Sequence, residues 1–164
     1  IGPRFGGAVN GAAGEWLKGV TKELEPKEHV ESYAKKRKYI MGIGHKKYRL
    51  GLPDPRTEVI KKFADNLDSH RFFDYAKAIE EITSAKKGNL ILNIDGHIAA
   101  LLLDILEQKE GYTEEELKQF VDIDFFNALF VIPRSIGFTA HYLDQKRLDE
   151  GLFRLPDNAV HLQE

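Results

Sequence analysis

The stretch NLILNIDGHIAALLLDILEQ, residues 89–108, decides the fold. Between Ile94 and Gln108 apolar residues occupy nearly every side of a helix, which predicts a helix that is buried all round. Residues 89–94 look like a short strand, but nothing nearby offers a second strand, so we expect an extended lead-in to the helix. A long apolar helix without paired strands around it predicts an all-α fold.

Helical periodicity continues on both sides of this segment. Asp54 and Pro55 suit the N-cap and first position of one helix, and Thr113 with Glu116 forms the capping box of another. Pro133 lies inside a long apolar run and predicts a kink there. The expected helices cover, approximately, residues 8–24, 26–37, 55–67, 71–85, 94–108, 113–121 and 124–149. In the third of these helices, the residues expected to face the core are Val59, Ile60, Phe63, Ala64 and Leu67.

The composition limits the possible functions. With 164 residues, the chain is long enough to form the hydrophobic core of about one domain. Its net charge of −2 gives no overall positive potential that would attract nucleic acid or an anionic membrane. The absence of cysteine excludes disulfides, thiolate catalysis and zinc–sulfur sites, and it fits a cytoplasmic protein. The longest apolar stretch, residues 98–103, is too short to span a bilayer. Because the chain starts at Ile1 without a secretory leader, we expect it to be part of a longer polypeptide.

Two clusters carry candidate chemistry. Residues 41–45, Met-Gly-Ile-Gly-His, are followed by Lys46, Lys47 and Arg49. They form either a loop whose glycines approach an anionic ligand or a surface loop with an incidental histidine. Asp95 stands at the mouth of the apolar helix, where a carboxylate is either an N-cap or an acid/base group with a raised pKa.

Arginines form a third group. Arg134 lies in the long apolar helix, where a buried arginine must form an internal salt bridge or receive an anionic ligand. Arg56 and Arg154 either join the same anion site or are solvated surface residues. One histidine, one carboxylate and several arginines around a small polyanion suit enolate or alkoxide chemistry on a polycarboxylate.

These clusters resemble the motifs of the citrate synthase superfamily. Gly42-Ile43-Gly44-His45 and Asp54-Pro55-Arg56 look like its G-x-G-H and D-P-R motifs. Asn93-Ile94-Asp95-Gly96 is similar to its N-V-D segment, and Arg134-Ser135-Ile136-Gly137 resembles its S-R-x-x-G helix with the first two residues exchanged. The order and spacing of these motifs agree along nearly the whole chain.

Within the superfamily, the chain looks like the C-terminal citryl-CoA lyase module of the ATP-citrate lyases. The long strings that carry this resemblance are residues 1–8, 90–96 and 137–148. Phe5 stands where citrate synthases have a catalytic histidine in a G-P-L-H-G-G-A motif, and phenylalanine cannot donate a hydrogen bond to an enolate oxygen. This departure favours the lyase branch, in which the first catalytic histidine lies upstream.

The resemblance implies a role for each matched residue. Asp95 would be the acid/base on the acetyl methyl carbon, or on the citryl hydroxyl proton during cleavage. His45 would hydrogen-bond the oxaloacetate carbonyl oxygen. Arg56 and Arg134 would clamp carboxylates, and Arg154 would reach into a neighbouring subunit's site. Coenzyme A, as substrate and product, would be bound by Ile40, Met41, Gly42, Ile43, Gly44, Lys86, Lys87 and Asn89, and no residue is assigned to a metal.

The resemblance also implies an organisation. Residues 1–95 would form a small lid domain, and residues 96–164 the C-terminal part of a large domain and the interface of a homo-oligomer, a dimer of dimers. The partners would be citryl-CoA, acetyl-CoA and oxaloacetate, with no nucleic acid and no membrane. ATP and Mg would act only in modules outside this chain, so we expect the chain alone to be inactive or nearly so.

Three alternatives stay open. The first is a stand-alone citryl-CoA lyase, which the residues before Ile1 would distinguish. The second is a citrate synthase, which Phe5 disfavours. The third is a non-catalytic oligomerisation core built on the apolar helices of residues 96–106 and 125–147.

Overall fold

The computed structural model describes residues 7–149 and 151 and divides the chain into two compact units, Ile1–Ala128 and Leu129–Glu164. The regular elements of the described residues are all helices, which confirms the all-α prediction. Two isolated β-bridges are the only extended pairing in this part of the chain. The expected boundary at residue 95 refers to the lid of a complete enzyme and stays a prediction.

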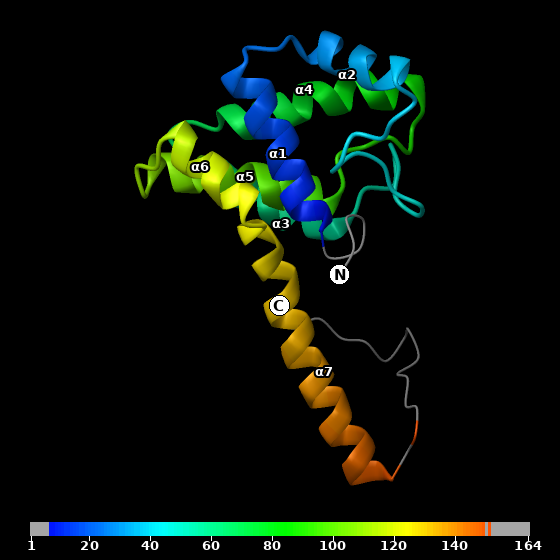
Figure 1. Ribbon diagram of the computed structural model, residues 1–164. Helices are drawn as coiled ribbons and strands as arrows, with labels where there is room; N and C mark the ends of the chain where they lie inside the picture. The colour runs from blue at the N-terminus through cyan, green and yellow to red at the C-terminus, as the bar shows by residue number, and fades with distance from the viewer. Residues whose placement is uncertain (1–6, 150, 152–164) are drawn as a thin grey trace. The chain divides into compact units, whose positions relative to one another are not determined.

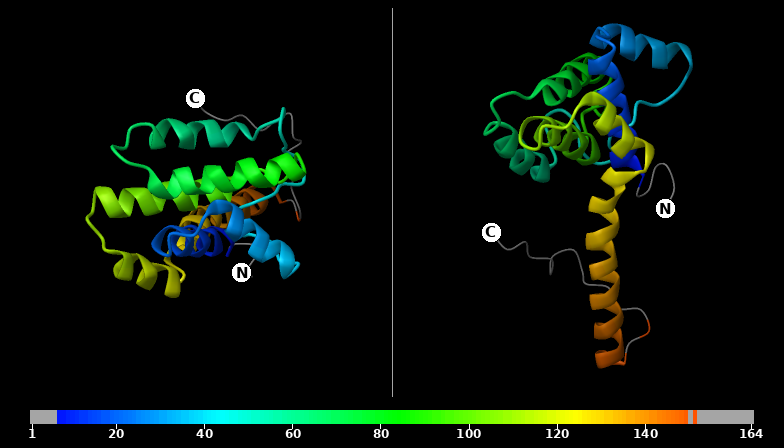
Figure 2. Two further views of the ribbon diagram at one scale, coloured as in Figure 1. Left: turned by 90° about the horizontal axis from the view of Figure 1, so that it is seen from above. Right: turned by 60° about the vertical axis from the view of Figure 1, so that its left-hand side comes forward.

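The first unit is built around one central helix (Figures 1 and 2). Helix α5 packs against α1, α3, α4 and α6, and α2 lies along α4. The helices of this unit are α1 (Ala8–Thr21), α2 (Pro26–Lys35), α3 (Pro55–Ala64), α4 (Arg71–Lys86), α5 (Ile94–Gln108) and α6 (Glu114–Asp122). The expected extended lead-in, buried helix and capping box at Thr113 are all confirmed.

The core of this unit comes from α1, α4 and α5. Trp16, Phe72, Ile79 and Leu103 are completely buried, so three helices meet through large apolar side chains. A polar network adds to the packing of α1, α2 and α4. In it, Glu15 accepts hydrogen bonds from Tyr33 and His29, and the other His29 ring nitrogen contacts the Tyr75 hydroxyl at 3.0 Å.

A buried carboxylate on α5 caps α4. Asp104 is fully buried and accepts hydrogen bonds from the backbone N–H groups of Phe72 and Phe73, at 3.0 Å each. These N–H groups belong to the first turn of α4, which has no side-chain cap from its own N-cap residue, His70. Burial raises the pKa of Asp104 to about 6.

The stripe predicted for α3 is wrong at two positions. Ala64 is buried, and Ile60 and Leu67 pack against the core, as expected. Val59 and Phe63 are exposed, at 56% and 62%. The face of α3 that meets the core is therefore narrower than its apolar residues suggest.

The helix predicted for residues 124–149 is wrong at its start. Asp124 adopts a left-handed conformation with φ of +59°, a 3₁₀ turn follows at Phe125–Asn127, and α7 runs over Ala128–Leu148 with Pro133 inside it. No described residue of α7 is buried, so the burial predicted for Arg134 is wrong. Apolar composition predicts that a helix is covered, but it does not say that the same chain covers it. The exposed large apolar side chains of α7 are Leu129, Ile132, Ile136, Phe138, Tyr142, Leu143 and Leu148. None of the described helices is long and apolar enough to cross a membrane.

Candidate active site

The two sequence clusters that carry candidate chemistry lie side by side. Residues 42–44 run antiparallel to residues 91–93, and the Gly44 N–H donates to the Ile91 carbonyl at 2.7 Å. A single isolated bridge joins the two segments, so the lead-in to α5 does have a partner, although the pairing is too short for a sheet. This pairing brings the candidate histidine and the candidate aspartate to the same place.

Glycine is required where the two segments meet. Gly42 has φ of +86°, and a Cβ there would lie 2.9 Å from both the Ala12 Cβ and the Gly96 Cα. A Cβ on Gly96 would lie 2.6 Å from the Gly42 carbonyl oxygen. The Trp16 indole N–H donates to the Gly96 carbonyl at 3.1 Å, which fixes α1 to the same point. At Gly42 and Gly96, the close approach is between backbones of this chain.

His45 is held with the proton on Nε2. The backbone N–H groups of Lys47 and Tyr48 both donate to Nδ1, at 3.0 Å each. Nδ1 is therefore an acceptor, and the neutral ring carries its proton on Nε2. The Tyr48 ring packs against the imidazole, with centroids 4.7 Å apart. A fixed Nε2–H is a suitable donor to a carbonyl, hydroxyl or alkoxide oxygen.

Asp95 is not the N-cap of α5. That position belongs to Asn93, whose side-chain oxygen accepts from the Gly96 N–H at 3.0 Å. The Asp95 carboxylate is half-buried and has no hydrogen bond or ion pair within the described part of the chain. Burial raises the pKa of Asp95, while the nearby charge of Arg56 offsets part of this rise. The N-cap interpretation is excluded, and the acid/base role is the remaining prediction.

Arg56 is anchored by Asp54 at the start of α3. Its Nε and Nη2 atoms donate to the two Asp54 carboxylate oxygens at 3.0 and 2.6 Å, and its backbone N–H donates to the same carboxylate. Asp54 is almost completely buried, and Arg56 lowers the pKa of its carboxyl. The Arg56 side chain is 57% exposed, and this pairing leaves its Nη1 group unused. The guanidinium is thus oriented and still able to bind an anion.

The other two predicted arginines are not placed at this site. Arg134 is exposed on α7 in the second unit, with its guanidinium 4.9 Å from the centre of the Phe130 ring. Arg154 and Phe5 lie outside the described residues. Their predicted roles therefore stay predictions.

The residues predicted for coenzyme A follow the same loop and the end of α4. Ile40 is buried, whereas Lys86 and Lys87 are exposed. Asn89 donates a long hydrogen bond of 3.4 Å to the His45 carbonyl. Its Oδ1 atom is buried without a partner in the described chain, so it is an acceptor that a ligand's N–H or O–H would satisfy.

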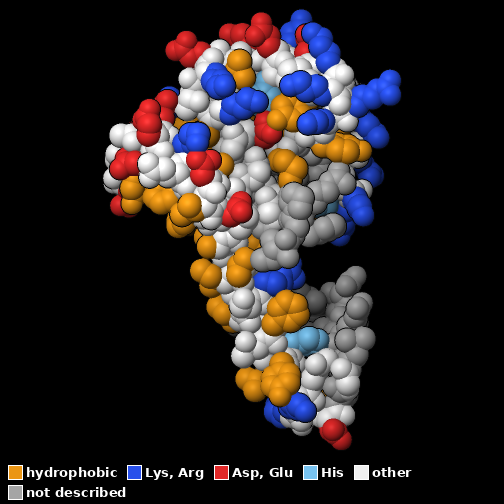
Figure 3. Space-filling model, viewed as in Figure 1, with side chains coloured by type: hydrophobic (Ala, Val, Ile, Leu, Met, Phe, Trp, Pro, Cys, Tyr) orange, Lys and Arg blue, Asp and Glu red, His pale blue; other side chains and the backbone are white. Residues whose placement is uncertain are grey.

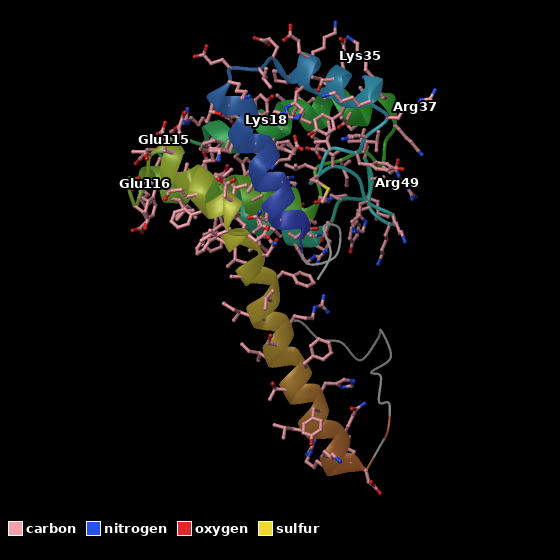
Figure 4. All side chains as sticks on the ribbon, in the orientation of Figure 1. Lys18, Lys35, Arg37, Arg49, Glu115 and Glu116 are labelled. Atoms are coloured by element: carbon pink, nitrogen blue, oxygen red, sulfur yellow. The ribbon has the colours of Figure 1, made fainter. Side chains whose placement is uncertain are left out.

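Basic side chains are spread over the visible face of the first unit and are most frequent along its right-hand edge in Figure 3. Figure 4 places Lys35, Arg37 and Arg49 on this side, at the end of α2 and in the loop that follows, whereas Glu115 and Glu116 lie on the opposite side, on α6. The chain as a whole is slightly acidic, so this basic edge is a local feature. A local basic edge suits a ligand that carries phosphate groups.

Neither His45 nor Asp95 lines either of two hollows in the first unit. One, of about 440 Å³, is between α1 and α6. The other, of about 200 Å³, borders α3, α4 and His97. No group of three or more potential His, Asp or Glu metal ligands occurs among the described residues.

Sequence reasoning missed two supporting residues. Asn93 is a favoured N-cap residue type three residues before Gly96, so its residue type was the signal that predicts the cap. Asp54 was correctly predicted as an N-cap, although its second role, holding Arg56, was not. The spacing of an aspartate two residues before an arginine was the signal that could have found it.

A histidine donor, a half-buried carboxylate and an anchored arginine thus come together on an all-α scaffold, and these features define the class of helical protein to be compared with known families. The family model described as citrate synthase, C-terminal domain, matches residues 1–155, and the chain belongs to this family.

Relatives and solved structures agree with this assignment. The chain is 46% identical over 164 residues to ATP-citrate synthase subunit 1 of Sordaria macrospora, a match that covers 99% of this chain and 24% of that protein. It is 43% identical over 157 residues to ATP-citrate synthase of Homo sapiens, covering 95% of this chain and 14% of that one. The chain thus spans no more than about a quarter of these curated relatives.

Two solved structures resemble the chain over nearly its whole length. The ATP citrate lyase from Methanothrix soehngenii in complex with citrate and coenzyme A matches with a TM-score of 0.87 and 41% identity, covering 100% of this chain and 27% of that one. The citryl-CoA lyase from Hydrogenobacter thermophilus matches with a TM-score of 0.61 and 26% identity, covering 99% and 59%.

Proposed function

We propose that this chain is the citryl-CoA lyase module of an ATP-citrate lyase and that, in the complete enzyme, it cleaves citryl-CoA to acetyl-CoA and oxaloacetate. The observation that carries the proposal is the half-buried, unpaired Asp95 carboxylate beside the Nε2 donor of His45 and the anchored Arg56. The similar ATP citrate lyase holds citrate and coenzyme A, which supports the same ligands here.

In this proposal Asp95 both accepts and returns one proton. Its carboxylate takes the proton of the citryl hydroxyl group, and the bond between the hydroxyl-bearing carbon and the thioester methylene carbon breaks. The electron pair of that bond becomes the thioester enolate, and the hydroxyl-bearing carbon becomes the carbonyl carbon of oxaloacetate. Asp95 then donates its proton to the methylene carbon, which gives acetyl-CoA. The raised pKa of Asp95 suits a group that works in both directions.

The neighbours of Asp95 would hold the oxygen atoms. His45 Nε2–H donates to the citryl hydroxyl oxygen and remains bonded to it as that oxygen becomes a carbonyl. Arg56 binds a carboxylate through its unused N–H groups, since a planar guanidinium matches a carboxylate better than an ammonium does. Arg134 and Arg154 would complete the carboxylate clamp, the latter from a neighbouring subunit.

Coenzyme A would lie along residues 40–44 and the end of α4. The unpaired Oδ1 of Asn89 and the exposed ammonium groups of Lys86 and Lys87 support this placement. Residues 1–95 would act as a lid domain, and residues 96–164 would belong to the large domain. ATP and Mg would act in other modules of a cytoplasmic enzyme.

The test is citryl-CoA cleavage by the full-length enzyme, followed as oxaloacetate release, with Asp95→Asn. We expect a loss of at least about a hundredfold in kcat, because the proton transfer loses its acid and base. Asp104→Asn is the matched control, since Asp104 is another buried carboxylate of α5, but both of its hydrogen bonds come from backbone N–H groups of α4. Near-normal cleavage by Asp95→Asn, or an equal loss in both variants, would remove Asp95 from the chemical step.

A second candidate function is assembly. The exposed apolar side chains of α7, such as Ile132, Ile136 and Leu143, favour a homo-oligomer in which another copy covers them. Light scattering of this chain should then give a mass above 18.7 kDa. A clean monomer would count against both this candidate and the expected dimer of dimers.

A further inference from the structure

Asn93 bonds to the loop before His45 through its two N–H donor groups, and to the first turn of α5 through its two carbonyl oxygens. Its side-chain oxygen accepts from the Gly96 N–H at 3.0 Å, and its side-chain amide donates to the Gly44 carbonyl at 3.1 Å. Its backbone N–H donates to the Gly42 carbonyl at 2.9 Å. Its backbone carbonyl accepts from the N–H and the Nδ1 of His97, at 3.0 Å each. No other side chain described in the first unit makes this combination of bonds.

The partners of the Asn93 side chain are the immediate neighbours of the two residues proposed to react. Gly44 precedes His45, and Gly96 follows Asp95. The amide group of Asn93, together with the backbone hydrogen bonds from Gly44 to Ile91 and from His45 to Asn89, therefore helps to set how far the loop that carries the imidazole lies from the helix that carries the carboxylate. We propose that Asn93 is a positioning residue, which holds His45 and Asp95 at the separation needed for both to meet one substrate molecule. This inference rests on the proposed function.

Capping alone does not account for asparagine at this position. An N-cap needs only an acceptor, and asparagine, aspartate and serine supply one about equally well. The amide N–H donor is not part of the cap, and it reaches a carbonyl in a segment that lies far away in the sequence. Aspartate has the same shape without the donor, and serine is too short to reach both partners. Both substitutions therefore keep the N-cap of α5 and remove the hydrogen bond from the Asn93 amide to the Gly44 carbonyl.

The experiment measures kcat and KM for citryl-CoA cleavage by the full-length enzyme with Asn93→Asp and Asn93→Ser. Because both variants keep the cap, we expect the melting temperature of the chain to change by only a few degrees. We expect kcat to fall about tenfold to a hundredfold, the effect of a displacement of about 1 Å between reacting groups. KM should change by less than kcat, because Asn93 is not proposed to touch the substrate.

Thr113→Ala is the matched control. It removes the side-chain cap of α6, the bond from the Glu116 N–H to the Thr113 hydroxyl, at a distance from His45 and Asp95. It should lower the melting temperature by about 2–4 °C and leave kcat unchanged. If the Asn93 variants lose activity only in proportion to their loss of folded protein, as a stability effect would require, the positioning role is refuted.

Asn93→Asp removes the amide donor and adds a negative charge, whereas Asn93→Ser removes the donor without adding a charge. A loss of kcat in Asn93→Asp alone would assign the effect to a second carboxylate near Asp95 and overturn the proposal. Normal kcat in both variants would overturn it as well. The proposed function is tested independently by Asp95→Asn. If that variant abolishes cleavage while the Asn93 variants do not, only this inference fails. If none of the variants affects cleavage, the proposed function fails with it.

Discussion

Replacing Gly42 by alanine would place one methyl group where α1, the loop that carries His45 and α5 meet. The φ of +86° costs an L-residue about 1–2 kcal/mol. The new methyl would also lie 2.9 Å from the Ala12 Cβ and the Gly96 Cα, so backbone must move, and overpacking of this kind costs about 1–3 kcal/mol. Together these effects lower the free energy of unfolding by about 2–5 kcal/mol.

Gly51→Ala provides the matched control. Gly51 has nearly the same φ, +80°, but no atom lies within 4 Å of the position that its Cβ would take. This variant should therefore lose only the conformational part, about 1–2 kcal/mol. The difference between the two variants, about 1–3 kcal/mol, isolates the packing of Gly42 against its neighbours.

Urea unfolding followed by tryptophan fluorescence measures both variants. Trp16 is the only tryptophan in the chain, it is completely buried, and its Cζ2 atom is 3.0 Å from the Cβ that alanine would add. The fluorescence therefore reports on the surroundings of residue 42, where the substitution is made. Equal losses in Gly42→Ala and Gly51→Ala would refute the reasoning, because they would show that the contact with Gly96 carries no energy.

Two further predictions concern buried ionisable groups. Because burial raises the pKa of Asp104 from 3.8 to about 6, its contribution to stability is complete below pH 4 and is lost as the pH rises through 6. Urea unfolding between pH 4 and 8 should show that the free energy of unfolding of Asp104→Asn lacks this decrease with pH. The same decrease in the variant as in the wild type would contradict the raised pKa of Asp104. Burial lowers the pKa of His97 below 6.5, and its Nε2 atom is buried without a described partner. His97 therefore costs stability as the pH falls below 6.5, and His97→Leu should raise the free energy of unfolding at pH 6 by about 1–2 kcal/mol. A less stable leucine variant would contradict this, and it would show that the lost bond from Nδ1 to the Asn93 carbonyl outweighs the cost of the unpaired Nε2 atom.

The features that the sequence predicted correctly are those with local signals. The cap at Asp54 and the capping box at Thr113 depend on residues within one turn, and both are confirmed. The extent of α5, Ile94–Gln108, agrees with the prediction because its apolar residues end where its helix ends. Burial follows from contacts between distant residues, and there the prediction was less successful. Val59 and Phe63 have apolar side chains at helical spacing but face solvent, because α3 meets the core through a narrow face.

The same distinction applies to the site. Sequence motifs indicated which residues are candidates for chemistry, but not what holds them. Nothing in the sequence around His45 predicts that two backbone N–H groups fix its tautomer, because that depends on the path of the loop through Lys47 and Tyr48. The proposed role of Arg134 needs a ligand or a partner that the described residues do not supply. The sequence predicted its burial, whereas the side chain is exposed on α7.

The geometry of the site depends mainly on residues that do not react. The Asp95 carboxylate makes no described hydrogen bond, and His45 is oriented by backbone groups. Their separation is instead set by the contact between Gly42 and Gly96 and by the amide of Asn93. A carboxylate without partners keeps a raised pKa and remains available to a substrate, whereas a strongly bonded one would be held in its charged form. Rigid backbone contacts can therefore position a group without lowering its reactivity, and substitutions at these supporting residues should reduce kcat without removing any reacting atom.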